Sequence, residues 1–319
     1  MAKIVALGSA LEDVFLVDHD DFVSSRDDSI YQKLRAGAKV EVDNVFYFTG
    51  GGGTNAATTF ARFGHESYYL GNVGRDEAGE NVRRDLEREG IRTEYLRFVS
   101  RRKTGHSVVL LDKKTGERMI LVYRGASAKF NNLNESMLDE IRPDYLYISS
   151  LGGDLETLAR FLKKARALKT KVMYNPGKEE LKQARDLIPL LDYVEILMTN
   201  REELQMLLPG AEANSLKRLT RLSPIVIITG GREGAVVQTI NASYLVPLYD
   251  NILPKDATGA GDAFGSGLLA SLARGDEIEQ AMLAAAANAT SVTQQLGAKA
   301  GILYGNERLH KIKIVKSVI

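Results

Sequence analysis

Apolar segments of strand length alternate with helix-like segments through the middle of the chain, and this alternation limits the fold more than any other feature. Four apolar segments are each followed by a helix-like segment: Ser67–Gly71 by Asp76–Glu89, Asp144–Ser149 by Leu155–Leu168, Lys171–Asn175 by Glu179–Leu191, and Tyr193–Met198 by Arg201–Leu208. Strands that are apolar throughout are buried on both faces, and helices between them connect parallel neighbours. We therefore predict an α/β fold in which helices cover both faces of a mainly parallel sheet.

Polar residues follow several of these predicted strands. Asn175, Asn200 and the segment Thr229–Gly231 stand at their carboxyl ends. Ligands of parallel sheets bind outside the carboxyl ends of the strands. We therefore expect the ligand site at these positions.

Two segments depart from the alternation, and both are rich in strand-forming residues. They are Phe15–Phe48 and Gly105–Tyr123. The second predicts a hairpin, because its arms Ser107–Leu111 and Arg118–Tyr123 are separated by a Lys-Lys-Thr-Gly turn signal. Both arms contain consecutive apolar residues, so a small sheet built from them needs cover on both faces.

A β lid satisfies this requirement. We expect a single domain of residues 1–319, with a lid formed by about residues 13–48 and 98–125 inserted in the α/β core. One face of the lid would close over the main domain, and the other would contact a second subunit in a homodimer.

The composition excludes several classes of function. The 319 residues include 42 basic and 41 acidic ones, so the chain lacks the positive field that would hold nucleic acid or an anionic membrane. The absence of cysteine excludes disulfides, thiolate nucleophiles and cysteine zinc sites. The four histidines are scattered, and no apolar segment reaches the roughly 20 residues of a membrane helix. We expect a soluble cytoplasmic protein whose chemistry depends on carboxylates and backbone amides.

The segment Asp256–Phe264 carries the clearest functional signal, with the sequence Asp-Ala-Thr-Gly-Ala-Gly-Asp-Ala-Phe. Gly259, Ala260 and Gly261 precede an apolar, helix-like segment. A helix that begins there has free N–H groups and partial positive charge at its first turn, and small residues let an anion approach them. Asp262 would repel a phosphate that is only bound, so its role would be to take the proton from an attacking hydroxyl. A glycine turn with an acidic first-turn residue would have the same sequence.

A second glycine-rich segment, Thr49–Asn55, follows a short predicted strand and opens a helix. Its glycines let the backbone approach a ligand, and Asn55 can both donate and accept hydrogen bonds, which suits sugar hydroxyls. The segment is neither a Walker A loop nor the Gly-x-Gly-x-x-Gly of a dinucleotide site. A flexible loop remains the alternative. Asp13, which follows the first predicted strand, would either bind substrate hydroxyls or serve as a turn residue or cap.

Three further segments have both a structural and a ligand-binding interpretation. Asn200 and Glu203 have the spacing of a helix capping box, and the same pair suits hydrated Mg²⁺ beside phosphates. Thr229–Gly234 ends a predicted strand and suits either a nucleotide or a hairpin turn. Asn288 follows the alanine block Ala284–Ala287, whose small face suits either tight helix packing or a flat base.

Taken together, these segments resemble the ribokinase-like, or PfkB, family of carbohydrate kinases. The resemblance extends over most of the chain, and its motifs follow the family's order: Gly8 to Asp13, Gly50–Asn55, Gly71–Asp76 with Gly79, Asn200 with Glu203, Thr229–Gly231 and Asp256–Asp262. It implies a three-layer αβα sandwich with a mainly parallel central sheet and a small β lid. It also implies transfer of the γ-phosphoryl group of MgATP to an alcohol.

The resemblance also implies roles for individual residues. Asp262 corresponds to the catalytic base, and the anion hole corresponds to Gly259, Ala260 and Gly261. The positions that hold the acceptor correspond to Asp13, Gly51, Gly52 and Asn55. The nucleotide and Mg²⁺ positions correspond to Asn200, Glu203, Thr229, Gly231, Gly234 and Asn288, with Glu203 near Mg²⁺ through water. Asp256 and Thr258 correspond to a pair near the K⁺ site of potassium-activated members.

One departure concerns the acceptor. Gly52 stands where ribokinases usually carry a lysine, which argues against a preference for ribose. Arg124, just past the predicted hairpin, would either face a polar or anionic acceptor or lie solvated at the surface.

We therefore predict an ATP-dependent kinase that phosphorylates a hydroxyl of a small sugar, of the ribokinase, fructokinase or 2-keto-3-deoxygluconate kinase type. The nearest alternative is a nucleoside kinase of the same family, in which Phe15, Phe46 and Tyr123 are candidates for stacking on a base. A remote alternative is a non-catalytic sugar or nucleotide sensor, although Asp262 and the glycines are present.

Overall fold

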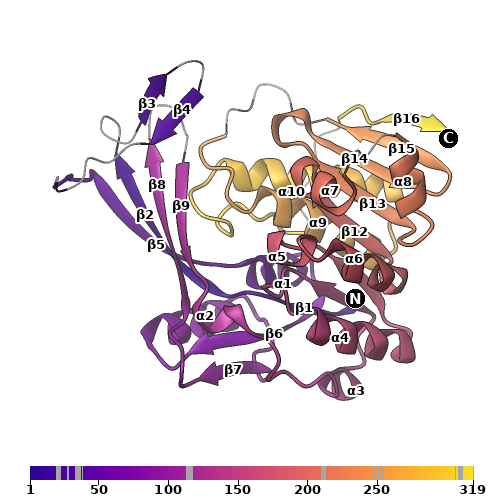
Figure 1. The fold of residues 1–319 in the computed structure, drawn as a ribbon, viewed down its shortest axis with the longest axis horizontal. Coiled ribbons are helices and arrows are strands. Elements are labelled where there is room, and N and C mark those ends of the chain that lie inside the picture. The colour runs from indigo at the N-terminus through magenta and orange to yellow at the C-terminus, as the bar shows by residue number, and fades with distance from the viewer. Residues whose placement is uncertain are drawn as a thin grey trace.

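The computed structural model describes residues 1–18, 23–26, 29–32, 37, 39–112, 118–209, 213–247, 249, 252, 254–305, 307 and 312–318. Its main element is a ten-stranded sheet with the order β16-β15-β14-β13-β12-β11-β10-β1-β6-β7 (Figure 1). The strands are β1 (Lys3–Leu7), β6 (Glu66–Gly74), β7 (Leu96–Val99), β10 (Tyr145–Ile148), β11 (Lys171–Tyr174), β12 (Ile196–Asn200), β13 (Ile225–Thr229), β14 (Ala235–Thr239), β15 (Ala242–Val246) and β16 (Val315–Val318). Neighbours from β7 to β13 are parallel, and those from β13 to β16 are antiparallel. The predicted mainly parallel sheet is confirmed.

Two hydrophobic cores lie on the two faces of this sheet. Strand β1 shows how they are separated, because alternate side chains of a strand point to opposite faces. Ile4 and Ala6 belong to one core, and Val5 and Leu7 to the other. Strands buried on both faces, with a helical layer over each core, give the three-layer α/β sandwich that the sequence predicts.

Helices supply the outer layers. The first core includes side chains of α1 (Gly52–Arg62), α2 (Glu77–Arg88), α9 (Ala260–Arg274) and α10 (Ile278–Thr293). The second includes side chains of α3 (Met137–Ile141), α4 (Leu155–Leu168), α5 (Lys178–Leu181), α6 (Ala184–Leu187), α7 (Arg201–Leu207) and α8 (Ala213–Leu219). The 3₁₀ helices are η1 (Gly125–Ala128), η2 (Ile188–Tyr193) and η3 (Gly231–Glu233). Among the described helices, none has a stretch long and apolar enough to cross a membrane.

The prediction of one helix over Glu179–Leu191 is wrong. The structure divides this segment into α5, α6 and η2. Pro189 lies in the first turn of η2 and has no N–H, so it cannot donate the backbone hydrogen bond that a continuous α-helix requires there.

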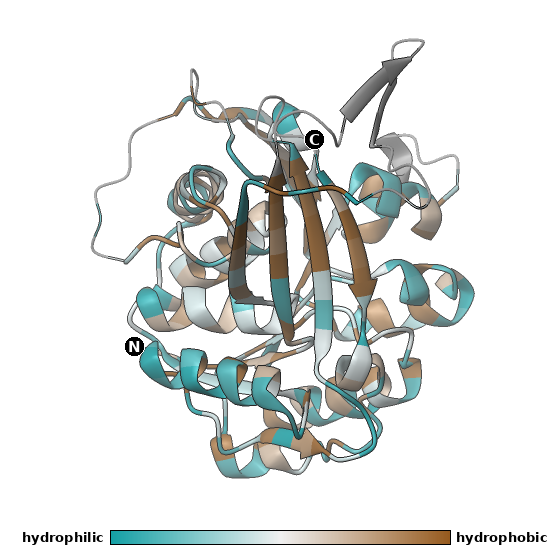
Figure 2. Ribbon diagram, turned by 90° about the vertical axis from the view of Figure 1, so that its left-hand side faces the viewer, coloured by the Kyte–Doolittle hydropathy of each residue, from teal (hydrophilic) through white to brown (hydrophobic). Residues whose placement is uncertain are grey.

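A separate four-stranded sheet, which we call the lid sheet, stands beside the α/β layers (Figures 1 and 2). Its order is β5 (Asn44–Gly50), β2 (Leu11–Asp18), β8 (Gly105–Asp112) and β9 (Arg118–Tyr123). Strands β8 and β9 pair antiparallel, as the predicted hairpin requires, and their connection, residues 113–117, lies outside the described residues. Strands β3 (Val23–Arg26) and β4 (Ser29–Gln32) form a small two-stranded sheet.

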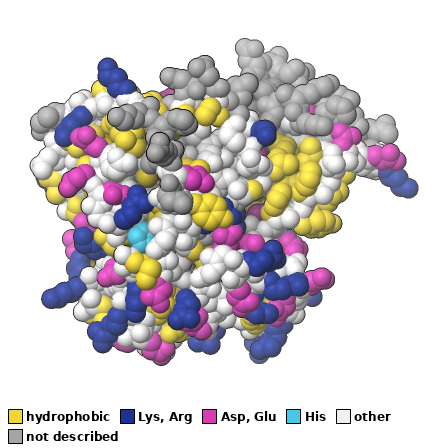
Figure 3. All heavy atoms as spheres, turned by 180° about the vertical axis from the view of Figure 1, so that it is seen from behind, with side chains coloured by type: hydrophobic (Ala, Val, Ile, Leu, Met, Phe, Trp, Pro, Cys, Tyr) yellow, Lys and Arg dark blue, Asp and Glu magenta, His cyan; other side chains and the backbone are white. Residues whose placement is uncertain are grey.

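The inner face of the lid sheet packs on the main domain. Phe15, Val17, Val109 and Leu111 form a buried cluster with Phe48, and Leu296, from the loop after α10, packs against it. The outer face carries exposed apolar side chains, namely Val45, Tyr47, Leu121 and Tyr123. Figure 3 shows hydrophobic side chains gathered where the lid sheet reaches the surface.

Candidate active site

Helix α9 begins within the segment Asp256–Phe264, as the sequence predicts. Its N-cap is Gly259, whose φ of 79° lies in the left-handed region that favours glycine. A Cβ at Gly259 would lie 2.4 Å from the Cβ of Ala298, whereas a Cβ at Gly261 would meet no atom within 4 Å. Asp262 lies in the first turn. The open space over Gly261 leaves the N–H groups of this turn accessible to an anion.

Asp262 is held from the neighbouring helix α1. The Nδ2 of Asn55 donates a hydrogen bond of 2.9 Å to its Oδ2. Burial raises the pKa of Asp262, and the hydrogen bond from Asn55 opposes this shift. A carboxylate with a raised pKa is a stronger proton acceptor than an ordinary aspartate.

The glycine-rich segment Thr49–Asn55 joins β5 to α1 and lies against Asp13 and Asp262. A Cβ at Gly50 would lie 2.0 Å from Oδ2 of Asp13, and a Cβ at Gly52 would lie 3.4 Å from Oδ1 of Asp262. Gly51 has a φ of 100°, and a Cβ there would lie 2.4 Å from the carbonyl oxygen of Ser9. The structure therefore brings together predicted residues from three distant parts of the sequence: Asp13, the segment with Gly51, Gly52 and Asn55, and Asp262.

Asp13 is buried on the inner face of the lid sheet, 5% exposed. Ser107 faces it in the register of β2 and β8, and the Ser107 hydroxyl donates a hydrogen bond to Oδ1 of Asp13. Burial raises the pKa of Asp13, while Ser107 and the nearby charge of Lys299 oppose the shift. Sequence reasoning missed Ser107, because only the strand register shows that it meets Asp13.

Several buried polar atoms near this cluster have no hydrogen-bond partner among the described residues. They are Oδ1 of Asn55, Oγ of Ser149 and Oγ1 of Thr199. Thr199 belongs to β12, whereas Ser149 directly follows β10. Because buried polar groups normally have partners, atoms left over at this edge of the sheet are consistent with a polar ligand or ordered water. Ser149 was also missed, although it ends an apolar strand, which is a usable signal.

The predicted capping box is confirmed at the start of α7. The N–H of Asn200 donates to Oε2 of Glu203 at 2.9 Å, and the N–H of Glu203 donates to Oδ1 of Asn200 at 2.8 Å. Burial raises the pKa of Glu203, and the charge of Asp262 raises it further. Among the described residues no three His, Cys, Asp or Glu side chains are grouped as direct metal ligands. Mg²⁺ therefore fits here only with water and phosphate oxygens completing its shell, with Glu203 beside it.

The segment Thr229–Gly234 forms the turn between β13 and the antiparallel strand β14. The N–H of Gly230 donates to the carbonyl of Gly234 at 2.8 Å. Gly231 and Gly234 have positive φ angles of 56° and 81°, so the hairpin itself accounts for these two glycines. The turn ends next to β12 and α7, because β13 pairs with β12.

Asn288 does not reach the surface of the site. It is fully buried, its Nδ2 donates to the carbonyl of Ala263 at 2.9 Å, and its Oδ1 accepts from the N–H of Leu303 at 2.9 Å. Both ends of the amide are thus used within the protein, and the side chain fixes α10 to α9. Of the two interpretations of the alanine block and Asn288, the structure therefore favours tight packing of α10 against α9.

Asp256 is buried in the main domain, whereas Arg124 is exposed at the end of the lid sheet. Asp256 is buried, and its carboxylate accepts hydrogen bonds from the N–H and Oγ1 of Thr258 and from the N–H of Gly297. Arg124 follows β9 and is exposed, and its charge contributes to lowering the pKa of Glu179 in α5. Arg124 thus lies between the lid sheet and the main domain.

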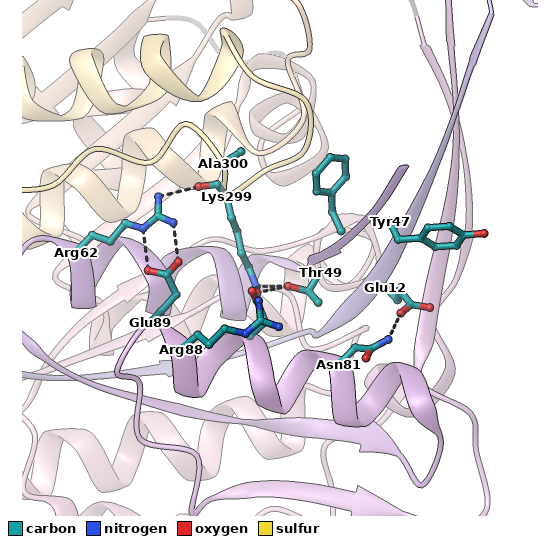
Figure 4. Close-up of a pocket in the computed structure, with 11 residues that line it drawn as sticks. Glu12, Tyr47, Thr49, Arg62, Asn81, Arg88, Glu89, Lys299 and Ala300 are labelled. Atoms are coloured by element: carbon teal, nitrogen blue, oxygen red, sulfur yellow. Dashed lines mark hydrogen bonds and ion pairs between the residues drawn. The ribbon is translucent and has the colours of Figure 1, made fainter. Parts of the chain in front are cut away.

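A pocket of about 330 Å³ lies behind β5 and contains no predicted site residue (Figure 4). Thr49 and Glu12 line it, whereas Gly50 and Asp13, one residue further along each strand, face the candidate site. Nζ of Lys299 donates to Oγ1 of Thr49 at 2.8 Å and lies 3.1 Å from Oδ2 of Asp85. This network attaches the glycine-rich segment to the loop after α10.

A helix N-terminus of small residues, a carboxylate beside it and a glycine-rich segment meet at the carboxyl edge of a parallel sheet, beside a separate β sheet. This combination defines a class of α/β phosphotransferases. The chain matches the pfkB family of carbohydrate kinases over residues 1–303, and it belongs to this family. The protein is accordingly a PfkB-type sugar or nucleoside kinase, a phosphotransferase that acts on a hydroxyl group.

Similar proteins include both sugar and nucleoside kinases. A ribokinase of Bacillus subtilis is 27% identical over 278 residues, covering 86% of this chain and 92% of the relative. A nucleoside kinase of Methanocaldococcus jannaschii is 24% identical over 282 residues, covering 86% of this chain and 90% of the relative. The structure of Arabidopsis thaliana ribokinase complexed with ribose and ATP has a TM-score of 0.75 at 21% identity, and the match covers 95% of this chain and 96% of that chain. At this identity, the similarity to the Arabidopsis structure shows only that the two chains share a fold.

Proposed function

We propose that the protein transfers the γ-phosphoryl group of MgATP to a hydroxyl of a small sugar, with Asp262 as the general base. The observation that carries this proposal is the position of Asp262. It lies in the first turn of α9, within hydrogen-bond reach of Asn55, and burial raises its pKa. A base in this position can take a hydroxyl proton beside an anion-binding helix end.

The acceptor would lie between the lid sheet and the glycine-rich segment. Asp13, Gly51, Gly52 and Asn55 would hold its hydroxyls, and exposed Arg124 would contact its outer end. The unpartnered Oδ1 of Asn55 supports this role, because it is free to accept a hydrogen bond from a sugar hydroxyl.

In the reaction, the acceptor hydroxyl gives its proton to Asp262 as its oxygen bonds to the γ-phosphorus. The bond from this phosphorus to the bridging oxygen of ADP breaks in line. The backbone N–H groups at Gly259, Ala260 and Gly261 would stabilise charge on the transferred group. Mg²⁺ supplies further charge neutralisation when bound.

The nucleotide would lie along the neighbouring strand ends. Asn200 and Glu203 would face its phosphates and the hydrated Mg²⁺, and the turn containing Thr229, Gly231 and Gly234 would lie along the nucleotide. Asp256 and Thr258 mark the place where we propose that K⁺ acts, if the enzyme is activated by it.

The test is release of ADP from MgATP with ribose, fructose, 2-keto-3-deoxygluconate, adenosine, inosine and cytidine, each with and without K⁺. Asp262→Asn should lower turnover at least about a hundredfold, the scale of lost general base catalysis, while nucleotide binding stays nearly intact. Asp186→Asn, an exposed site in α6, is the matched control and should behave as wild type. Normal turnover of Asp262→Asn would refute the assignment of the base. ATP binding without turnover on any of these acceptors would mean an acceptor outside the panel or a sensor.

A nucleoside acceptor is the second candidate, and the lid sheet carries the observation that favours it. Ile120 and Val122 lie on the inner face, opposite Val109 and Ser107, and they are 41% and 53% exposed. An exposed apolar wall beside Ser107 and Asp13 would suit the flat face of a base. Of the aromatic residues predicted to stack, Phe46 fits this role, because it lies on the inner face opposite Phe15 and is 37% exposed. The other two fit less well: Phe15 is fully buried against Phe48, and Tyr123 lies on the outer face, opposite His106. Turnover on nucleosides alone would establish this alternative.

We also propose that a second copy of the chain covers the outer face of the lid sheet. Leu121, Tyr123 and Tyr47 are 55%, 54% and 69% exposed there, and exposed apolar patches of this kind usually mark interfaces. Light scattering should give the mass of a dimer, and Leu121→Glu should give a monomer. A monomeric wild-type protein would refute this proposal.

A further inference from the structure

Arg118, the first residue of β9, reaches from the lid sheet to the loop that precedes α9. Its Nε lies 3.9 Å from Oδ1 of Asp256. The Arg118 side chain is 28% exposed, whereas that of Asp256 is completely buried. The pair therefore crosses from the lid sheet to the main domain, next to the N-cap of the candidate anion-binding helix.

Asp256 fixes two loops at once. Its Oδ1 accepts hydrogen bonds from the N–H of Thr258 at 2.9 Å and from Oγ1 of Thr258 at 2.6 Å, and its Oδ2 accepts from the N–H of Gly297 at 3.0 Å. The first bonds shape the turn into Gly259, and the last fixes the loop after α10. A buried carboxylate is costly without a nearby positive charge, and Arg118 supplies one.

The contact between Arg118 and Asp256 is incomplete. Nε of Arg118 is buried and has no hydrogen-bond partner among the described residues, and 3.9 Å exceeds the length of a hydrogen bond. A displacement of about 1 Å would convert the contact into a charge-assisted hydrogen bond. A buried donor without a partner is expensive, so small movements that satisfy it are favoured.

The inner face of the lid sheet also contacts the loop that Asp256 holds. Leu296 packs against the cluster that contains Phe15 and Leu111. A Cβ added to Gly297 would lie 3.0 Å from the ring of Phe48. The position of the lid sheet and the shape of the loop before α9 are therefore linked by direct contacts.

We propose that Arg118 is a positioning residue that couples the lid sheet to the start of α9. When the lid sheet closes on the acceptor, Nε of Arg118 donates to Asp256, and the turn through Thr258 to Gly259 is held in the geometry that aligns the first N–H groups of α9. With the lid sheet open, that turn is less restrained, and transfer of the phosphoryl group to water is disfavoured. This proposal rests on the proposed kinase function for its catalytic consequence.

The first experiment is hydrogen–deuterium exchange of the full chain, which needs no turnover. Arg118→Met keeps the length of the side chain and removes its charge, Arg118→Lys keeps the charge, and Arg221→Met changes an exposed arginine as the matched control. Arg118→Met should speed exchange in β9 and in residues 293–298. Arg118→Lys should do so less, and Arg221→Met should not.

The second experiment is steady-state kinetics on the acceptor that the panel identifies. Loss of the contact should raise the KM for the acceptor roughly tenfold, because a smaller fraction of molecules is in the closed state. The value of kcat at saturating acceptor should change far less, and ATP hydrolysis without acceptor should not rise, because the turn before α9 stays unrestrained. Asp256→Asn combined with Arg118→Met should match Asp256→Asn alone, since the two side chains act as one unit.

Unchanged exchange in β9, or an acceptor KM within a factor of two of wild type, would overturn the proposal. Additive effects of the two substitutions would overturn it as well, and so would a uniform rise in exchange with a lower Tm, which indicates a merely structural role. If the wild-type protein phosphorylates none of the acceptors, the proposed function fails, and the exchange experiment still decides whether Arg118 couples the two parts.

Discussion

Gly259→Ala tests whether the start of α9 is the anion site. Gly259 has a φ of 79°, and alanine in this left-handed conformation costs about 1–2 kcal/mol. The added Cβ would also lie 2.4 Å from Cβ and 2.9 Å from Cα of Ala298. Ordinary carbon contacts are about 3.5–4.0 Å, so the loop must move by roughly 1 Å or more. Such overpacking costs about 1–3 kcal/mol, which makes the total about 2–5 kcal/mol.

A displacement of this size should affect catalysis more than folding. Moving reacting groups by about 1 Å can lower a rate about a hundredfold. We therefore expect Gly259→Ala to lower kcat about a hundredfold and to lower Tm by several degrees. The assays are ADP release at saturating substrates and thermal unfolding.

Gly275→Ala provides the control at the other end of α9. Gly275 also has a positive φ, 97°, but an added Cβ would meet nothing within 4 Å. It should lose about 1–2 kcal/mol of stability and keep its turnover. The reasoning is refuted if Gly259→Ala turns over within threefold of wild type, or if Gly275→Ala loses as much turnover as Gly259→Ala does.

Three further substitutions test other parts of the site. Asn55→Ala removes the hydrogen bond that opposes the rise in the pKa of Asp262, so this pKa should rise further. The acid limb of the pH–rate profile should therefore move to higher pH, and a move to lower pH would contradict the argument. Lys299→Met removes the cation beside the partly buried Asp85, to which Thr49 still donates, and should cost about 1–3 kcal/mol in denaturant unfolding. Burial raises the pKa of Asp85, but Lys299 and Thr49 lower it more, so this stabilisation should be present at neutral pH and lost below about pH 3.8. Glu203→Gln keeps the capping geometry and removes the charge, so the Mg²⁺ concentration for half-maximal rate should rise about tenfold, measured by titration.

The sequence predicted the parts of the fold that depend on local pattern. The alternation of strands and helices, the start of α9 and the capping box of Asn200 and Glu203 are set by short-range physics, namely burial on both faces and unsatisfied helix ends. Motifs at strand ends also came together, because parallel strands bring their carboxyl ends to one edge. Asn200 and Thr229, at the ends of the parallel strands β12 and β13, could be predicted to lie side by side for this reason.

The remaining contacts depend on register and on packing between distant elements. Ser107 meets Asp13 because β2 and β8 pair in one particular register, and a shift by one residue would turn Ser107 away. Arg118 meets Asp256, and Lys299 meets Thr49, across elements whose relative position no local pattern specifies. The alanine block before Asn288 suits either tight helix packing or a flat base. Only the hydrogen-bond partners of Asn288 in the structure identify it as a packing residue.

The two carboxylates of the candidate site should reduce the stability of the folded protein at neutral pH. Burial raises the pKa of both Asp13 and Asp262 above the ordinary value of 3.8. A carboxyl group with a raised folded pKa contributes stability below its unfolded pKa and loses it as pH rises through its folded pKa. Keeping Asp13 and Asp262 ionised at neutral pH thus lowers the free energy of unfolding. Their proposed roles, holding the acceptor and removing its proton, require the ionised forms.

Asp13→Asn and Asp262→Asn should therefore melt at a higher temperature than wild type at pH 7, and this advantage should disappear below about pH 3.8, where wild type is protonated as well. Asp186→Asn, at an exposed position, should show no such dependence. Thermal unfolding across pH measures this directly. A lower Tm for both site variants at pH 7 would mean that these carboxylates stabilise the fold, and the functional interpretation of their burial would be lost.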